Sequence, residues 1–261
     1  MDCKNYPAYL QKQVLNNDAI ELHYARPDIT KANFMGICSV TSYSKIAHHP
    51  DALSPLDQES LISTSKWFLD ISRKSDWGKD VRWFIQDQLL DTPGKAQVIS
   101  RNNAMRPPVQ FLDYQGIQDT DILQEYFIPI AAASHFMDDL KAIVTTENIN
   151  ILSITLRHVK ADHESFLPYA PNETIAFVLY INHGKDAASV ERAKNWTRQL
   201  INAAQLRGGS YYLTYANYAT SEQIRKSYPM LDNFFAKKRQ YDPLGLFSNK
   251  FYEQYALHAT D

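Results

Sequence analysis

The chain has 261 residues, of which 44% are hydrophobic and 21% are charged. This balance is typical of a folded globular protein and excludes a disordered or fibrous chain. The 27 basic and 29 acidic residues give a formal net charge of −2, so no overall positive field is available to attract nucleic acid or an anionic membrane. We therefore expect no nucleic-acid binding and a partner that is recognised locally.

Only two cysteines, Cys3 and Cys38, occur, and 35 positions separate them. No CxxC motif or Cys/His cluster lies nearby, so we interpret them as two buried or incidental thiols, with a disulfide or a metal site as the alternatives. The N-terminus has neither a basic stretch nor an apolar run, and no apolar run approaches the roughly 20 residues that span a bilayer. These features predict a protein of the reducing cytoplasm without a transmembrane segment.

The first part of the chain predicts two strands followed by helices. Residues 19–25, AIELHYA, alternate apolar and polar side chains as a half-buried strand does, and residues 32–41 are a second candidate strand. Between 55 and about 91, apolar residues recur at spacings of three and four, which predicts helices. Residues 92–120 contain several prolines and glycines and little periodicity, which is typical of a long loop or covering segment.

A clearer pattern begins at residue 121. It predicts, in order, a strand at 121–130, a helix at 131–148, strands at 151–159 and 174–182, a helix at 187–206 and a strand at 210–215. This order is that of a split βαβ, or ferredoxin-like, unit, which we place within residues 122–215. The predicted fold class is α+β, with a largely antiparallel sheet, helices on one face and the other face free to line a ligand site.

A helical tail is predicted after this unit. Thr220, followed three residues later by Gln223, forms a capping box for a short helix, and Pro229 begins a second one. We interpret the chain as one continuous α+β domain with two lobes, 1–120 and the ferredoxin-like 121–261.

Several motifs of cofactor and nucleophile chemistry are missing from the sequence. The eight glycines form neither a GxGxxG nor a P-loop spacing, although the pyrophosphate of a dinucleotide usually lies against such a loop. His48 and His49 belong to no HExxH motif, so no metal site is predicted, and no GxSxG elbow occurs. If a dinucleotide is involved, another polypeptide or a missing segment must hold most of it.

The alternation of the strands predicts a polar sheet face. In the strand at 151–159, one side is predicted to carry Ser153, Thr155 and Arg157, and the other Leu152, Ile154 and Leu156. Hydroxyls, an amide and a guanidinium together suit a polar, hydroxylated ligand, and a solvated outer face is the alternative. The predicted ligand face consists of Gln124, Tyr126, Thr155, Arg157 and Tyr215.

Five segments of the chain carry a family resemblance: LQEYFIPI, ILSITLRHV, IAFVLYIN, GGSYYLTYANYATSEQIRKSYP and FFAKKRQYDPLGLFSNKFY. With a weaker echo in VISRNNA at 98–104, they resemble the C-terminal, substrate-binding (cap) region of FAD-linked oxidases of the vanillyl-alcohol oxidase class. The nearest members are the sugar-lactone, alditol and decaprenylphosphoryl-ribose oxidases. The resemblance covers about residues 120–255 and implies that a separate N-terminal domain, absent here, binds the FAD.

The resemblance also implies roles for particular residues. Gln124 and Tyr126 match strand residues that line the substrate pocket. Thr155 and Tyr180, on neighbouring predicted strands, are further candidate substrate-binding residues.

Two further positions are implied to lie near the flavin. Arg157 resembles a strand cation, and Asn249 corresponds to a segment that approaches the cofactor. Tyr215, with Arg157, is a candidate catalytic residue, but several relatives have a lysine at its position. A tyrosine supplies no fixed positive charge at neutral pH, so the substrate of those relatives cannot be transferred to this chain.

The implied chemistry is hydride transfer from a carbinol carbon of a sugar-, polyol- or lactone-like substrate to FAD, with a nearby base taking the hydroxyl proton. We expect the chain to need a flavin-binding domain or polypeptide and to be inactive alone. The alternatives are a flavin-free ferredoxin-like binding module and an inactive remnant of such an enzyme. Exposed apolar patches of several hundred Å2 would favour the oxidoreductase that works with a flavin-binding domain.

Overall fold

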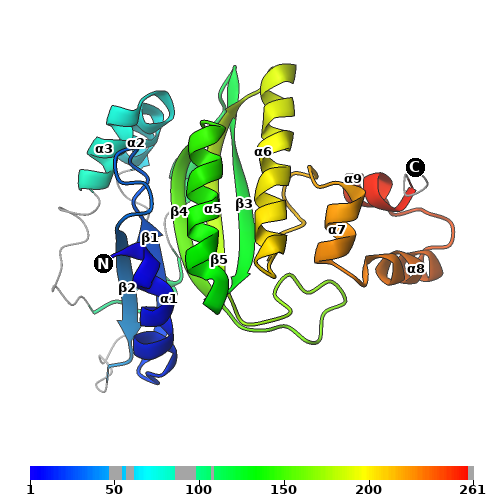
Figure 1. Ribbon diagram of the computed structural model, residues 1–261, viewed down its shortest axis with the longest axis horizontal. Coiled ribbons are helices and arrows are strands. Elements are labelled where there is room, and N and C mark those ends of the chain that lie inside the picture. Colours follow the sequence, from blue (N-terminus) through cyan, green and yellow to red (C-terminus); the bar gives the residue numbers. More distant parts are fainter. Residues whose placement is uncertain (47–54, 57–61, 86–97, 107–108, 258–261) are drawn as a thin grey trace.

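A computed structural model describes residues 1–46, 55–56, 62–85, 98–106 and 109–257. A six-stranded sheet crosses the middle of the described molecule in the order β2-β1-β4-β5-β3-β6, and its neighbouring strands are antiparallel (Figure 1). The strands are β1 (Ile20–Pro27), β2 (Cys38–Ser44), β3 (Asp119–Pro129), β4 (Asn150–Val159), β5 (Thr174–Gly184) and β6 (Ser210–Tyr211). The predicted α+β class is confirmed, and the sheet continues from the first predicted lobe into the second.

Two long helices, α5 and α6, lie side by side on one face of this sheet (Figure 1). Helices α7, α8 and α9 extend beyond them towards the C-terminus. The helices are α1 (Tyr6–Tyr9), α2 (Ile62–Lys74), α3 (Asp76–Phe84), α4 (Arg101–Ala104), α5 (Ala133–Thr146), α6 (Ala187–Leu206), α7 (Ser221–Ser227), α8 (Leu231–Tyr241) and α9 (Lys250–Tyr252). None of the helices in the described residues is long and apolar enough to span a bilayer.

The order of elements predicted after residue 121 is confirmed. Helix α6 has the predicted bounds because the Asp186 side chain accepts a bond from Ser189 N at its start, and Gly208, with a φ of 71°, follows its end. The capping box of Thr220 and Gln223 at the start of α7 is also present.

Two predicted strands have different bounds. The second strand begins only at Cys38, because turns precede it and Met35 adopts a positive φ of 56°. The predicted strand at 210–215 ends at Tyr211. The Tyr212 N–H still donates to Glu125 O, but the chain then turns away from the sheet edge.

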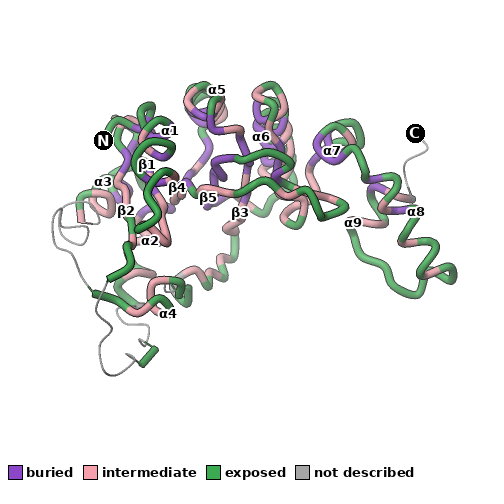
Figure 2. The backbone as a smooth tube through the Cα atoms, turned by 90° about the horizontal axis from the view of Figure 1, so that it is seen from below, coloured by how far each residue is buried: buried purple, intermediate pink, exposed green. Residues whose placement is uncertain are grey.

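The main core lies between the sheet and helices α5 and α6, where Figure 2 shows buried chain. Fully burying each large apolar side chain contributes about 1.5–3 kcal/mol. The contributing side chains include Phe136 and Leu140 of α5, Leu200 of α6, Ile154 and Leu156 of β4, and Phe177 and Leu179 of β5.

A β-bulge in β4 changes the predicted alternation. The register against β5 shifts between Ile151 and Ser153, so Leu152 lies on the opposite face from Ile154. There it packs with Leu69 of α2 and with Tyr180. Helix α2 therefore covers one end of the face that was predicted to be free. The rest of that face, on the opposite side of the sheet from α5 and α6, is called the open face below.

A buried ion pair fixes α2 to this end of the sheet. Arg73 of α2 bonds to Asp121 of β3 through Nε, 3.0 Å from Oδ2, and both side chains are at most 5% exposed. The Asp121 carboxylate also accepts bonds from the Tyr180 hydroxyl and from Asn182 Nδ2. The guanidinium of Arg73 lies 3.7 Å from the centre of the Tyr114 ring.

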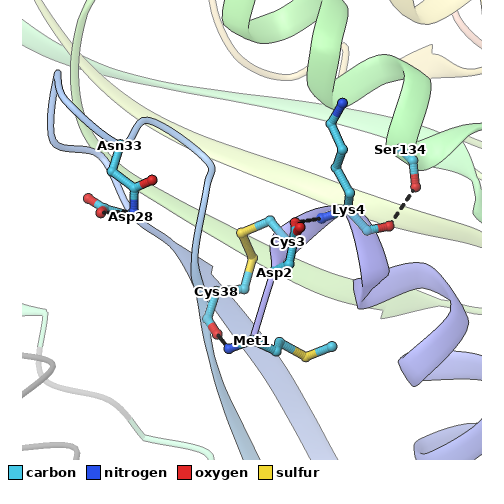
Figure 3. Close-up of a disulfide and its surroundings, with 8 residues drawn as sticks. All are labelled: Met1, Asp2, Cys3, Lys4, Asp28, Asn33, Cys38 and Ser134. Carbon is cyan, nitrogen blue, oxygen red and sulfur yellow. Dashed lines mark hydrogen bonds between the residues drawn. A yellow bond between two sulfur atoms is a disulfide. The ribbon is translucent and has the colours of Figure 1, made fainter.

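Cys3 and Cys38 form a disulfide (Figure 3), so the prediction of two free thiols is wrong. The N-terminal segment pairs with the chain just before β2: Cys3 N donates to Gly36 O and Cys38 N to Met1 O. These bonds bring the two Cα atoms to 4.9 Å. Sequence spacing could not reveal this pairing, because it depends on a long-range contact.

Replacing Cys3 with serine is expected to lower the free energy of unfolding by about 2–4 kcal/mol, because the bond closes a long loop in the unfolded chain. Urea denaturation of the C3S variant, compared with the wild type with and without a reductant, measures this loss. If reductant leaves the wild-type midpoint unchanged and alkylation labels both cysteines before denaturation, the disulfide does not form in solution.

Candidate functional site

Gln124 and Tyr126 do not lie on the open face. In β3 they stand opposite Leu179 and Phe177 of β5, whose side chains point into the core under α5 and α6. The Tyr126 hydroxyl donates to Gln124 Oε1 at 2.6 Å, and Gln124 Nε2 donates to Thr197 Oγ1 of α6 at 2.8 Å. The prediction that Gln124 and Tyr126 share a face with Thr155 and Arg157 is therefore wrong.

Replacing Tyr126 with phenylalanine is expected to destabilise the fold by about 1–3 kcal/mol, because Gln124 Oε1 is left buried without its donor. Thermal denaturation measures this effect. Since the hydroxyl faces the helix layer, substrate oxidation by the folded Y126F variant is expected to match the wild type when the chain is assembled with its flavin-binding domain. A loss of kcat without a loss of stability would contradict this assignment.

Tyr180 lies on the same face of the sheet as Thr155 and Arg157, but at the end that α2 covers. It is 8% exposed, and its hydroxyl donates to the Asp121 carboxylate. This side chain therefore anchors α2, and the structure gives it no free position for a substrate.

Thr155 and Arg157 of β4 lie on the open face as predicted from alternation. Thr155 stands opposite Val178 of β5, and Val178 in turn stands opposite Glu125 of β3, so these three residues form one row across the sheet. Arg157 is exposed in the next row, and its charge acts on Glu125. A hydroxyl, a guanidinium and a carboxylate thus meet on one face.

Tyr215 approaches this row from the loop after β6 rather than from a strand. Its ring lies 5.2 Å from that of Tyr212, whose N–H bonds to Glu125 O. Burial, followed by the negative charge of Glu125, raises the pKa of Tyr215, while Arg157 opposes the shift. The phenol is therefore neutral at physiological pH and can donate a hydrogen bond.

Glu125 is the site residue that sequence analysis missed. Burial raises the pKa of its carboxyl above the ordinary value of 4.5, and the charge of Arg157 partly offsets this. A half-buried carboxylate of raised pKa is suited to accept a proton from a ligand hydroxyl. The signal was present in the sequence, because an acidic residue stands between the buried Gln124 and Tyr126 and must point the other way.

Two further arginines lie on the same side of the sheet, close to the end that α2 covers. Arg26 of β1 lies 5.0 Å from the Tyr24 ring, and Arg82 of α3 donates to Leu152 O at 2.6 Å. Burial and the neighbouring guanidiniums of Arg26 and Arg73 lower the pKa of Arg82 to about 10. Among the described residues, no ion pair joins Arg26 or Arg82 to a carboxylate.

Asn249 is the residue before α9, a helix of the C-terminal tail that lies away from the sheet (Figure 1). Its side chain caps α9 by accepting from Tyr252 N at 2.8 Å, so the structure does not bring it together with Arg157. The neighbouring tail segment 241–247 exposes large apolar side chains. Their exposed fractions are 83% for Tyr241, 81% for Leu244, 75% for Leu246 and 78% for Phe247.

Within the described ranges, no group of three or more histidine, cysteine, aspartate or glutamate side chains is placed to hold a metal ion.

Comparison with known families gives one finding. A family model described as D-arabinono-1,4-lactone oxidase matches residues 99–255. This range begins before α4 and ends in the last turn of the tail, so it contains the whole cluster on the open face and the exposed tail segment. No curated protein matches the chain.

Proposed function

Because the chain belongs to the D-arabinono-1,4-lactone oxidase family, we propose that it forms the substrate-binding cap of an FAD-dependent oxidoreductase. The family match corresponds to the C-terminal region of FAD-linked sugar-lactone oxidases. In this proposal the cap works with a flavin-binding domain and oxidises a CH–OH group of a sugar-, polyol- or lactone-like substrate.

The observation that carries this proposal is the cluster on the open face. Glu125 accepts the proton of the substrate hydroxyl, because its carboxylate is half-buried and of raised pKa. Arg157 balances the charge of that carboxylate and orients substrate oxygens, and the neutral Tyr215 phenol donates a hydrogen bond to one of them. Thr155 adds a hydroxyl in the same cross-strand row.

The residues of this face fit a flavin. When bound, FAD supplies the acceptor for the hydride that leaves the carbinol carbon. Arg157, Arg26 and Arg82 provide cations on the side of the sheet without the α5–α6 layer, where a flavin ring and its negative charge would be stabilised. Asn249 belongs to the exposed tail, which would reach the cofactor from a different direction.

The exposed tail segment 241–247 favours this proposal over a flavin-free binding module or an inactive remnant. Four neighbouring apolar side chains that are each at least three-quarters exposed are unfavourable in water and typical of a protein interface. A module that had lost its partner domain would be expected to carry polar side chains there instead.

Replacing Leu246 with aspartate is expected to weaken association with the flavin-binding domain by at least about tenfold, since a charge would be buried in the interface. Leu206 is a matched control, because it is 73% exposed at the end of α6 and outside the tail. Sedimentation or light scattering of the mixed domains measures the association. Equal binding by L246D and L206D would contradict docking through the tail.

The compartment is a separate proposal. The cytoplasm was expected partly because the cysteines were read as free thiols, and the Cys3–Cys38 disulfide instead favours an oxidising environment. Alkylation and mass spectrometry of protein taken directly from cells distinguish the two.

The test of the proposed function is the visible absorbance of the chain after incubation with FAD and desalting, first alone and then with the flavin-binding domain. The proposal expects no retained flavin band for the chain alone and substrate oxidation only in the mixture. If the domains associate and no hydroxylated substrate is oxidised, the chain is an inactive remnant of such an enzyme.

A further inference from the structure

A cavity of about 250 Å3 lies between the loop 160–173, which joins β4 to β5, and the junction of α7 with α8. Its apolar wall consists of Phe127, Phe166, Pro168, Pro171, Pro229 and Met230. Glu125, Arg157 and Tyr215 do not line it. The cavity is therefore distinct from the cluster on the open face, although the Phe127 ring contacts Tyr212, which contacts Tyr215.

One polar group in the cavity wall lacks a partner. Thr174, at the start of β5, is 2% exposed, and its Oγ1 has no hydrogen-bond partner in the described part of the chain. Buried hydroxyls are normally paired, so an unpaired one in a cavity wall points to a ligand atom. The other hydroxyls of the wall are already engaged: Ser210 Oγ donates to Tyr169 O, Ser227 Oγ accepts from Gln205 Nε2, and the Tyr228 hydroxyl donates to Tyr211 O.

A single charged side chain, that of Lys226, lines the cavity among the described residues. It is exposed in the last turn of α7 and makes no ion pair with any described carboxylate. One ammonium and one unpaired hydroxyl, with Asn172 as a further polar residue of the wall, suit a carboxylate rather than a phosphate, which has more charge and more acceptor oxygens to satisfy.

Two glycines of the turn between α6 and β6 also line the cavity. At Gly209 a Cβ atom would lie 2.4 Å from Phe127 O, and Gly208 has a positive φ of 71°. A side chain at either position would be strained. This part of the cavity wall therefore requires glycine.

We propose that this cavity binds a small aromatic carboxylate of about phenylpropanoate size. Its ring packs against Phe127, Phe166 and the prolines, and its carboxylate binds Lys226 Nζ and accepts a hydrogen bond from Thr174 Oγ1. The site uses no residue of the oxidation chemistry, so it is independent of the proposed function.

Titration of the full chain with 3-phenylpropanoate, followed by two-dimensional amide NMR, tests this site. We expect saturable shifts at the amides of Thr174, Gly208 and Gly209. Replacing Lys226 with methionine is expected to weaken binding roughly tenfold, as loss of a charged hydrogen bond does. The neutral amide, 3-phenylpropanamide, is expected to bind wild type as weakly as the acid binds K226M.

Two controls keep the result specific. Replacing Lys237 with methionine removes an exposed lysine on α8 that does not line the cavity, and it should leave the affinity unchanged. Replacing Thr174 with valine keeps the side-chain shape and breaks no bond in the described chain, so this variant should fold and bind several-fold more weakly. Absence of saturable shifts in the wild type, or equal affinities of K226M and K237M, would overturn the proposal.

Discussion

Replacing Glu125 with glutamine is expected to lower kcat of the assembled oxidase, meaning this chain with its flavin-binding domain, by about 10²- to 10⁴-fold. This is the usual contribution of a positioned general base. The amide keeps the size of the side chain but cannot take the hydroxyl proton. Steady-state oxidation of a sugar-, polyol- or lactone-like substrate that the assembled wild type turns over, with KM and kcat determined separately, measures the effect.

The pH dependence of the same variant gives an independent check. Because burial raises the pKa of Glu125, wild-type kcat/KM is expected to rise as pH increases through that raised value, and the E125Q profile should lack this limb. The folded state holds the proton more tightly than the unfolded state. The contribution of Glu125 to stability is therefore present at low pH and lost as pH rises from the ordinary pKa through the folded one.

At neutral pH the E125Q variant should consequently be at least as stable as the wild type, since it no longer buries a charge. A folded E125Q protein with wild-type kcat would exclude Glu125 as the base. The Y126F variant is the matched control on the opposite face of the same strand, and its stability rather than its turnover should change.

Replacing Arg73 with methionine is expected to lower the free energy of unfolding by about 3–5 kcal/mol. The Asp121 carboxylate would remain buried with bonds only from Tyr180 and Asn182, and an uncompensated buried charge is strongly unfavourable. Denaturant titration monitored by circular dichroism measures the loss.

The matched control for this prediction is Arg101, which is paired with Glu21 at 3.3 Å but is 67% exposed. R101M should cost less than about 1 kcal/mol, because exposed ion pairs contribute little. Similar losses for R73M and R101M would show that the Arg73–Asp121 pair does not anchor α2 to the sheet.

The elements that local chemistry determines could be predicted from the sequence. Helix α6 has a clear apolar stripe, an aspartate at its start and a glycine after its end, and the capping box of α7 needs only Thr220 and Gln223. The alternation of β4 after its bulge also placed Thr155 and Arg157 correctly on one face.

The features that depend on register and long-range pairing could not be predicted. Alternation places Gln124 and Tyr126 on one side of β3 but does not show which side faces the helices. In the structure these two side chains face the helices, and Glu125 lies on the open face. The bulge at Leu152 and the Cys3–Cys38 disulfide likewise arise from contacts between distant segments. The predicted side of the sheet was therefore correct for the residues of β4 and wrong for those of β3.

The most direct test of the central claim is the flavin absorbance of the assembled oxidase, recorded without oxygen as members of a panel of sugar-, polyol- and lactone-like substrates are added. If this chain is the substrate-binding cap, the flavin band should bleach with the wild-type chain, and bleaching should be slowed at least about 10²-fold with E125Q. Equal bleaching when the chain is omitted or carries E125Q would contradict the account.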